Sequence, residues 1–130
     1  MSENIFKVFG EQTKETLLEI IAKCMDDYLY VYDLQNNTME LSESAVDRFM
    51  ISGNVINDVT NILLQVVYEE DRKMLQEHLT AICEGKEKVH NLHYRWLDKE
   101  GMPVWINCRG IVIIDQQGKA EYLVGCLNAV

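Results

Sequence analysis

Proline is almost absent from this sequence, and no segment is rich in serine and glycine. The chain of 130 residues contains one proline, and it has no internal repeat and no run of like charge. Linkers and disordered tails are built from such segments. Hydrophobic residues make up 48% of the chain and charged residues 25%, which suffices for a packed core. These features predict a single globular domain.

Positive charge is also scarce. The chain has 12 lysines and arginines against 21 acidic residues, which gives a net charge of −9. Nucleic acids and anionic membrane surfaces bind a basic face, so neither is an expected partner. No run approaches the ~20 apolar residues of a membrane-spanning helix. The first residues also lack the basic and apolar segments of a signal peptide. We therefore expect no membrane contact from this segment and a cytoplasmic location.

Sequence patterns of enzymes and metal sites are missing as well. Cys24, Cys83, Cys108 and Cys126 form no CxxC pair, so we expect no zinc site and reduced thiols. There is no glycine loop for phosphate and no serine in a nucleophile elbow. Acidic pairs such as Glu69-Glu70 are typical of a helix start. The expectation is a regulatory domain without catalytic residues.

Hydrophobic periodicity divides the chain into helices and strands. An amphipathic helix is predicted from about Gln12 to Met25, and short helical pieces lie between Ser42 and Val67. Ser42 or Ser44, and then Asn57 or Asp58, are the candidate helix caps. A further helix follows Glu69 and ends at Gly85. The predicted strands are Tyr28–Asp33, Thr38–Leu41, Val89–Leu97, Val104–Ile114 and Ala120–Val130. This order predicts an α+β domain with a five-stranded antiparallel sheet and short central helices.

Two of the strands are apolar at successive positions, which predicts a sheet covered on both faces. Ile111–Ile114 and Tyr122–Val124 carry this pattern. The central helices would cover one face, and the N-terminal helix or a second copy of the protein the other. We therefore assign residues 1–26 to a cap or dimerisation helix and residues 27–130 to the domain. The candidate dimer residues are Leu17, Ile20, Ile21 and Cys24.

Several motifs, in this order, resemble those of PAS domains. They are Glu70-Asp71-Arg72, His93-Tyr94-Arg95, the loop Asp98–Gly101 before Val104-Trp105-Ile106, Arg109-Gly110, Asp115–Gly118 and Leu123-Val124-Gly125. The segments Asp27–Asp33, Asn91–Trp96 and Pro103–Gly110 look most like PAS domains N-terminal to bacterial GGDEF diguanylate cyclases. The resemblance implies a PAS fold and a sensory domain in cyclic di-GMP signalling. Where that family often ends in Asp-Ile-Thr, this sequence has Asn128-Ala129-Val130.

The candidate ligand-binding residues are Tyr94, Trp96, Asn107, Arg109 and His78. Arg95 and Arg109 lie on predicted central strands, where a charge is costly unless it is paired. One interpretation is a salt bridge or solvent exposure, and the other is recognition of a carboxylate ligand with help from Asn107.

Aromatic side chains on the strands admit structural interpretations. Tyr28, Tyr30 and Tyr32 share one strand face and pack in the core, or else line a pocket or dimer surface. Trp96 and Trp105 flank one hairpin and could form a cross-strand pair.

Haem and flavin are not expected as cofactors. Haem-binding PAS domains carry their histidine about three residues after the motif arginine, where this sequence has Leu75, whereas His78 comes later. Asn107-Cys108-Arg109 echoes the flavin-adduct motif, but it falls in a predicted strand rather than a helix.

Two functions remain open at this point. The first is a sensor that binds an unknown small ligand, forms a homodimer and controls an output domain in the same protein. The second is a dimerisation module without a ligand, which brings two cyclase domains together.

Overall fold

The computed structural model describes residues 27–130. Its elements are β1 (Tyr28–Asp33), β2 (Thr38–Leu41), α2 (Ser44–Arg48), β3 (Val55–Asn57), α3 (Val59–Val66), the 3-10 helix η1 (Glu69–Asp71), α4 (Arg72–Cys83), β4 (Val89–Leu97), β5 (Pro103–Ile114) and β6 (Ala120–Ala129). The predicted helix Gln12–Met25, with the candidate dimer residues Leu17, Ile20, Ile21 and Cys24, lies outside the described residues. That helix stays a prediction.

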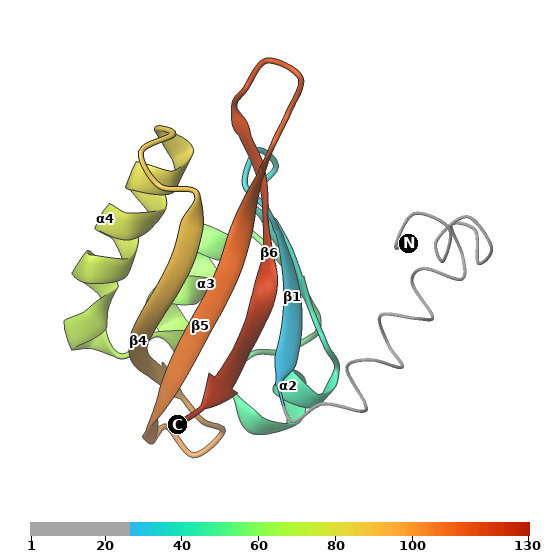
Figure 1. Cartoon of the computed structure of the whole chain (residues 1–130). Helices are drawn as coiled ribbons and strands as arrows, with labels where there is room; N and C mark the ends of the chain where they lie inside the picture. Colours follow the sequence, from blue (N-terminus) through green and yellow to red (C-terminus); the bar gives the residue numbers. More distant parts are fainter. Residues whose placement is uncertain (1–26) are drawn as a thin grey trace.

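One antiparallel sheet organises the fold, and its strands follow the order β3-β2-β1-β6-β5-β4 (Figure 1). The five predicted strands are all present, and the α+β fold class is confirmed. The sheet has a sixth strand, β3, which pairs with β2 through Met39 and Ile56. Sequence analysis missed it because its three residues directly follow a Gly-Asn break. Strand β1 lies between β2 and β6, inside the sheet.

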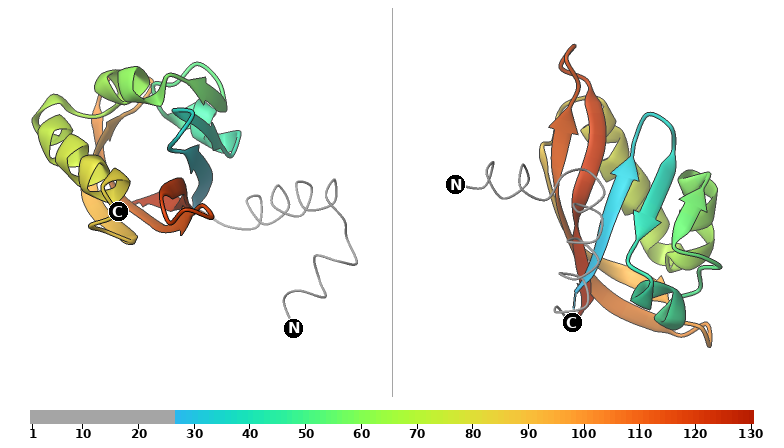
Figure 2. Two further views of the ribbon diagram at one scale, coloured as in Figure 1. Left: turned by 90° about the horizontal axis from the view of Figure 1, so that it is seen from above. Right: turned by 90° about the vertical axis from the view of Figure 1, so that its right-hand side faces the viewer.

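The helices pack against one face of the curved sheet, and the core lies between the two layers (Figure 2). Strand residues alternate between this inner face and the outer face. Tyr30 and Tyr32 of β1 are buried on the inner face, as are Tyr94 and Trp96 of β4. Tyr30 and Tyr32 therefore pack in the core, and because both also line the cavity, neither interpretation of the tyrosine strand excludes the other.

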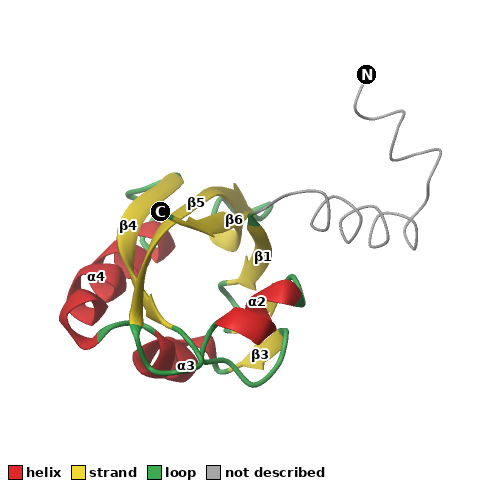
Figure 3. Cartoon of the chain, turned by 90° about the horizontal axis from the view of Figure 1, so that it is seen from below, coloured by secondary structure: helices red, strands yellow, loops and turns green. Residues whose placement is uncertain are grey.

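Helix α3 is held in place by a residue of the β1–β2 turn. Asp58 precedes the helix with a φ of 57° and makes no side-chain cap, so the expected capping by Asn57 or Asp58 is wrong. Instead, the Asn37 side-chain oxygen accepts hydrogen bonds from the Thr60 N–H (3.2 Å) and hydroxyl (3.1 Å). The Asn37 carbonyl accepts another from the Val59 N–H. The cap comes from a turn that is distant in sequence, so the start of α3 is held against the β1–β2 turn. Figure 3 shows α3 near the short strand β3.

Helix α4 ends as the sequence predicts. Gly85 follows it with a φ of 78°, and the Gly85 and Lys86 N–H groups donate to carbonyls of the last turn. This left-handed residue is the usual end of a helix, and glycine adopts it without steric cost.

The outer face of the sheet carries an exposed apolar row among the described residues. Cross-strand pairing aligns Val89, Ile111, Val124 and Val31 across β4, β5, β6 and β1. Val89 is 62% exposed and Ile111 64%. Within residues 27–130, helices therefore cover the inner face of the sheet, as predicted, and not the outer face. The exposed row is the surface that the sequence assigned to the N-terminal helix or a second copy.

Candidate functional site

A small cavity lies between the inner face of the sheet and helices α3 and α4. Its volume is about 20 Å³, which holds about one water molecule. The lining residues are Tyr30, Tyr32, Met39, Leu63, Leu75, Leu79, His90, Tyr94, Trp96, Cys108, Leu123 and Leu127. This set contains a few hydrogen-bonding groups within an apolar wall, which is the usual composition of a ligand pocket.

Two glycines allow Tyr30 to reach across the sheet from β1 to β5. Gly125 of β6 pairs with Tyr30, and Gly110 of β5 pairs with Gly125. A Cβ atom at Gly110 would lie 2.6 Å from the Tyr30 hydroxyl, and one at Gly125 would collide with the Arg109 carbonyl. The Tyr30 hydroxyl therefore occupies the space that a side chain at Gly110 would fill, and Gly125 lets β6 lie close to the backbone of β5.

The Tyr30 hydroxyl forms a buried polar link to strand β5. It donates to the Arg109 backbone carbonyl (3.1 Å) and accepts from the Cys108 thiol (3.4 Å). Burial raises the pKa of Tyr30, with a smaller contribution from Cys108. Burial also raises the pKa of Cys108 to about 11. Both groups are uncharged at neutral pH, so Cys108 behaves as a small core residue rather than a reactive thiol.

Three buried nitrogen atoms near the cavity have no hydrogen-bond partner among residues 27–130. They are His90 Nδ1, Trp96 Nε1 and His78 Nε2. A buried polar group without a partner costs about 1–3 kcal/mol. The Tyr94 hydroxyl lies near the Trp96 indole but without the geometry of a hydrogen bond. Unpaired groups of this kind are what a bound water or ligand would satisfy.

His78 and His90 contact one another across the α4–β4 boundary. Their ring centroids are 4.8 Å apart, with 46° between the planes. Burial lowers the pKa of His90 to about 4, with a smaller contribution from His78. His90 is therefore neutral at physiological pH. His78 packs behind the cavity wall, against the histidine that lines it.

The two tryptophans lie on opposite faces of the sheet, so the predicted cross-strand pair is wrong. Trp96 is 2% exposed on the inner face and packs edge-on against Phe49, with ring centroids 5.1 Å apart. Trp105 is 48% exposed on the outer face and lies opposite Arg95.

Arg95 is paired with a carboxylate of the protein itself. Its Nε and Nη2 donate to the two oxygens of Asp71 (2.9 and 2.8 Å), and its backbone N–H donates to Oδ2. The guanidinium also lies over the rings of Tyr68 and Trp105. The hydrogen bond from Arg95 is the largest cause of the lowered pKa of Asp71. The salt-bridge interpretation of Arg95 is confirmed, and this pair ties η1 to β4.

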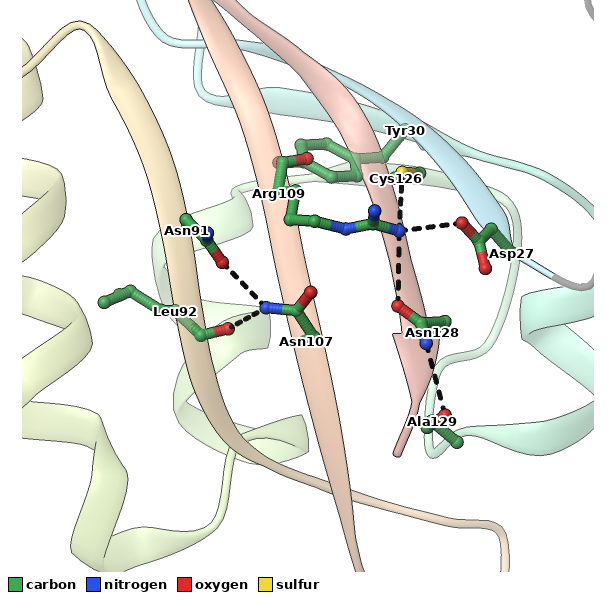
Figure 4. Close-up of polar contacts among 9 residues, drawn as sticks. All are labelled: Asp27, Tyr30, Asn91, Leu92, Asn107, Arg109, Cys126, Asn128 and Ala129. Carbon is green, nitrogen blue, oxygen red and sulfur yellow. Dashed lines mark hydrogen bonds and ion pairs between the residues drawn. The ribbon is translucent and has the colours of Figure 1, made fainter.

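Arg109 and Asn107 extend from the outer face of β5, away from the cavity (Figure 4). Arg109 Nη2 donates to Asp27 Oδ2 (2.8 Å), Asn128 Oδ1 (3.3 Å) and Cys126 Sγ (3.4 Å). Asn107 donates to the Asn91 side chain (2.8 Å) and the Leu92 carbonyl (3.3 Å). Arg109 thus joins the start of β1 to the end of β6, and its salt bridge also agrees with the structural interpretation.

The predicted ligand residues therefore separate into two groups. Tyr94 and Trp96 line the cavity and His78 supports it, whereas Asn107 and Arg109 lie on the opposite face. Sequence analysis missed His90 and Cys108 as lining residues, whereas it allowed a pocket role for Tyr30 and Tyr32. The alternation of β4 was the available signal for His90, because residues 90, 94 and 96 share one face.

Residues 27–130 show neither a metal-binding cluster nor a membrane-spanning helix. That region contains no group of three or more His, Cys, Asp or Glu side chains arranged to hold a metal ion. None of its helices is long and apolar enough to cross a membrane.

Residues 53–127 match the protein family described as PAS fold. The chain belongs to this family. The match covers most of the PAS domain, from β3 to the inner-face Leu127 of β6. No curated protein sequence matches the chain.

Solved PAS structures share the fold at low sequence identity. A sensory box histidine kinase/response regulator from Burkholderia thailandensis is 18% identical, with a TM-score of 0.67, covering 87% of this chain and 83% of that one. The N-terminal domain of a diguanylate cyclase with PAS/PAC sensor from Marinobacter aquaeolei is 17% identical, with a TM-score of 0.64, covering 79% and 94%. The PAS domain of the fruit-fly ELK potassium channel is 16% identical, with a TM-score of 0.58, covering 87% and 96%. These proteins have different outputs, so the shared fold does not identify the output of this domain.

Proposed function

We propose that this PAS domain is a sensory module that binds a small ligand in its interior cavity and controls a signalling domain of the same protein. The observation that carries the proposal is the pair of unpartnered nitrogens, Trp96 Nε1 and His90 Nδ1, on residues that line the cavity. A ligand that bonds either atom offsets the cost of leaving a buried polar group without a partner.

The cavity must enlarge to admit anything bigger than water. Met39 is an unbranched, adaptable side chain in its wall, and Leu63 and Leu79 come from the partly exposed sides of α3 and α4. Two packings of this layer, closed and open, give a ligand the differential affinity that a switch requires. The open packing is the state that the ligand favours.

Tyr30 offers a route from the cavity to the outer face. Its hydroxyl bonds the Arg109 carbonyl, and the side chain of the same Arg109 bonds Asp27 and Asn128. A ligand that moves Tyr30 therefore perturbs the backbone that positions this contact between the start of β1 and the end of β6. The outgoing signal would pass through that contact to the neighbouring domain.

We further propose that the output domain is a diguanylate cyclase and that the module acts as a homodimer. Support comes from the sequence resemblance of Asp27–Asp33, Asn91–Trp96 and Pro103–Gly110, and from the Marinobacter domain of similar fold. A cyclase joins two substrate molecules held by two enzyme domains, so a dimeric regulator suits that reaction.

Native mass spectrometry of freshly purified protein tests the ligand and the dimer together. We expect a retained mass above that of the polypeptide, and a raised melting temperature in the loaded protein because a ligand bound to the folded state stabilises it. Protein that carries no added mass, and whose melting temperature is unchanged by cell extract, would contradict the ligand proposal.

A second candidate, a dimerisation module without a ligand, is favoured by the exposed apolar row on the outer face. Side chains also fill the core almost completely, because the remaining cavity holds about one water molecule. Ile111→Glu, at the centre of the row, should then dissociate the dimer in sedimentation experiments. Val55→Glu, on the edge strand β3 and also exposed, is the control that should leave it intact. If Ile111→Glu stays dimeric, the row is not the interface.

A further inference from the structure

We infer that the cavity selects an uncharged ligand with an apolar body and a hydrogen-bond acceptor that meets the Trp96 indole. The inference rests on the proposed function, because it names the class of ligand that the same cavity takes. It also replaces the carboxylate ligand suggested by the sequence with a neutral one.

The first step concerns charge. The residues that line the cavity, all within the described part of the chain, include no Asp, Glu, Lys or Arg. His90 is neutral because its pKa is lowered, and Tyr30 and Cys108 are neutral because theirs are raised. A charged ligand would lose its hydration and find no counter-charge, which is a heavy cost in an apolar interior. A neutral ligand avoids that cost.

The second step concerns the arginines that could have bound an anion. Arg95 already holds Asp71 through two side-chain hydrogen bonds. Arg109 holds Asp27 on the outer face. Neither guanidinium lines the cavity. A carboxylate inside the domain would therefore be out of reach of both.

The third step concerns the hydrogen-bonding group. The indole N–H of Trp96 is a donor only, and the buried side chain makes no hydrogen bond among residues 27–130, although the Tyr94 hydroxyl lies near it. It therefore requires an acceptor such as a carbonyl, ether or hydroxyl oxygen. His90 lies six positions earlier on the same strand, about 20 Å away along the backbone at ~3.3 Å per residue. We assign the ligand's acceptor to Trp96 only.

The experiment uses the indole N–H of Trp96 as its reporter. The chain contains two tryptophans, so Trp105→Phe leaves a single indole signal in a ¹H–¹⁵N spectrum. Trp105 lies on the outer face, and phenylalanine retains an aromatic ring over Arg95. The probes are benzyl alcohol, toluene, benzoate and benzylammonium, which share one ring and differ in charge and acceptor.

We expect benzyl alcohol to move the Trp96 indole proton downfield and saturably. Its dissociation constant should lie at least about tenfold below those of benzoate and benzylammonium, since a buried unpaired charge costs more than one factor of ten. Toluene should bind more weakly than benzyl alcohol and without the downfield shift. Trp96→Phe should remove the advantage of benzyl alcohol over toluene, measured by thermal stabilisation.

Each of the other outcomes overturns a specific part of the proposed ligand class. Benzoate or benzylammonium binding as tightly as benzyl alcohol would overturn the neutral class and leave the proposed cavity function standing. Toluene binding as well as benzyl alcohol would overturn the acceptor requirement. A Trp96 signal that no probe moves would overturn the proposed function as well, because the cavity then does not open. If Trp96→Phe fails to fold, the spectra of Trp105→Phe alone decide.

Discussion

Replacement of Gly125 by alanine tests the close approach of β5 and β6 that lets Tyr30 cross the sheet. An added Cβ would collide with the Arg109 carbonyl and come within 2.6 Å of the Gly110 Cα. Both obstacles are backbone atoms, which cannot rotate away as the end of a side chain can. The methyl group therefore forces β5 and β6 apart or bends them.

The expected cost is large for a single methyl group. Overpacking costs about 1–3 kcal/mol, and a collision with backbone belongs at the upper end, about 3 kcal/mol. For a domain of this size that loss lowers the melting temperature by about 10 °C or more. With an m-value of about 2 kcal/mol/M, the urea midpoint falls by about 1.5 M. Circular dichroism and tryptophan fluorescence would follow the thermal and the urea transitions.

Gly53→Ala is the matched control, because nothing lies within 4 Å of a Cβ at that position. Its free energy of unfolding should stay within about 0.5 kcal/mol of the parent protein. If Gly125→Ala were as stable as Gly53→Ala, the strands would not approach so closely. The reach of Tyr30 to the Arg109 carbonyl, and the proposed route through it, would then lose their basis.

Three further predictions concern the buried polar groups. Tyr30→Phe should lower the free energy of unfolding by about 1 kcal/mol through loss of the bond to the Arg109 carbonyl, whereas Tyr122→Phe on the outer face should have a smaller effect in the same urea titration. His90 has a pKa of about 4 in the folded state against 6.5 as a free side chain, so the unfolded chain binds the proton first. The free energy of unfolding should fall by up to about 3 kcal/mol as the pH drops from about 6.5 towards 4. His90→Gln should flatten this pH dependence, whereas His93→Gln, at an exposed position, should not. An unchanged slope in His90→Gln, or a flattened one in His93→Gln, would refute the assignment to His90. Because the pKa of Asp71 is lowered, its contribution is present above the ordinary aspartate range and lost as the pH falls through the lowered value. Asp71→Asn should therefore destabilise the protein at pH 7 more than Glu70→Gln, and equal effects of the two substitutions in urea titrations would contradict the contribution of the Asp71–Arg95 pair.

The fold could be predicted from the sequence because alternating apolar and polar residues indicate its strands, and Gly, Asn and Asp indicate its turns. Strand β3 could not, since three residues carry no period and gain their order from pairing with β2. The cap of α3 was equally hidden, because Asn37 is distant in sequence from the helix it caps. Such contacts depend on tertiary structure rather than local preference.

Tyr94 and Trp96 were predicted correctly as cavity residues, whereas Asn107 and Arg109 were not. Alternation within one strand tells which of its residues share a face, but the register between strands is needed to tell which face each neighbouring strand shares with it. The loop between Leu97 and Pro103 pairs Tyr94 with Ile106, so even-numbered residues of β4 and β5 share the inner face. Asn107 and Arg109 are therefore outside, and the same parity separates Trp96 from Trp105. Counting residue pairs outward from the Leu97–Pro103 loop would have predicted both the outward position of Asn107 and Arg109 and the separation of the two tryptophans. The unpartnered nitrogens could not be foreseen, because they depend on side-chain packing.

The pairing of Tyr28 with Leu127 brings the first and last strands of the PAS domain side by side in the middle of the sheet. A short peptide joining the two ends would therefore leave every strand where it is. New termini could be opened in the exposed loop between α4 and β4, giving a circular permutant with the same sheet order. In such a protein the cavity would keep its walls, while the contact of Arg109 with Asp27 and Asn128 would sit beneath a closed bridge.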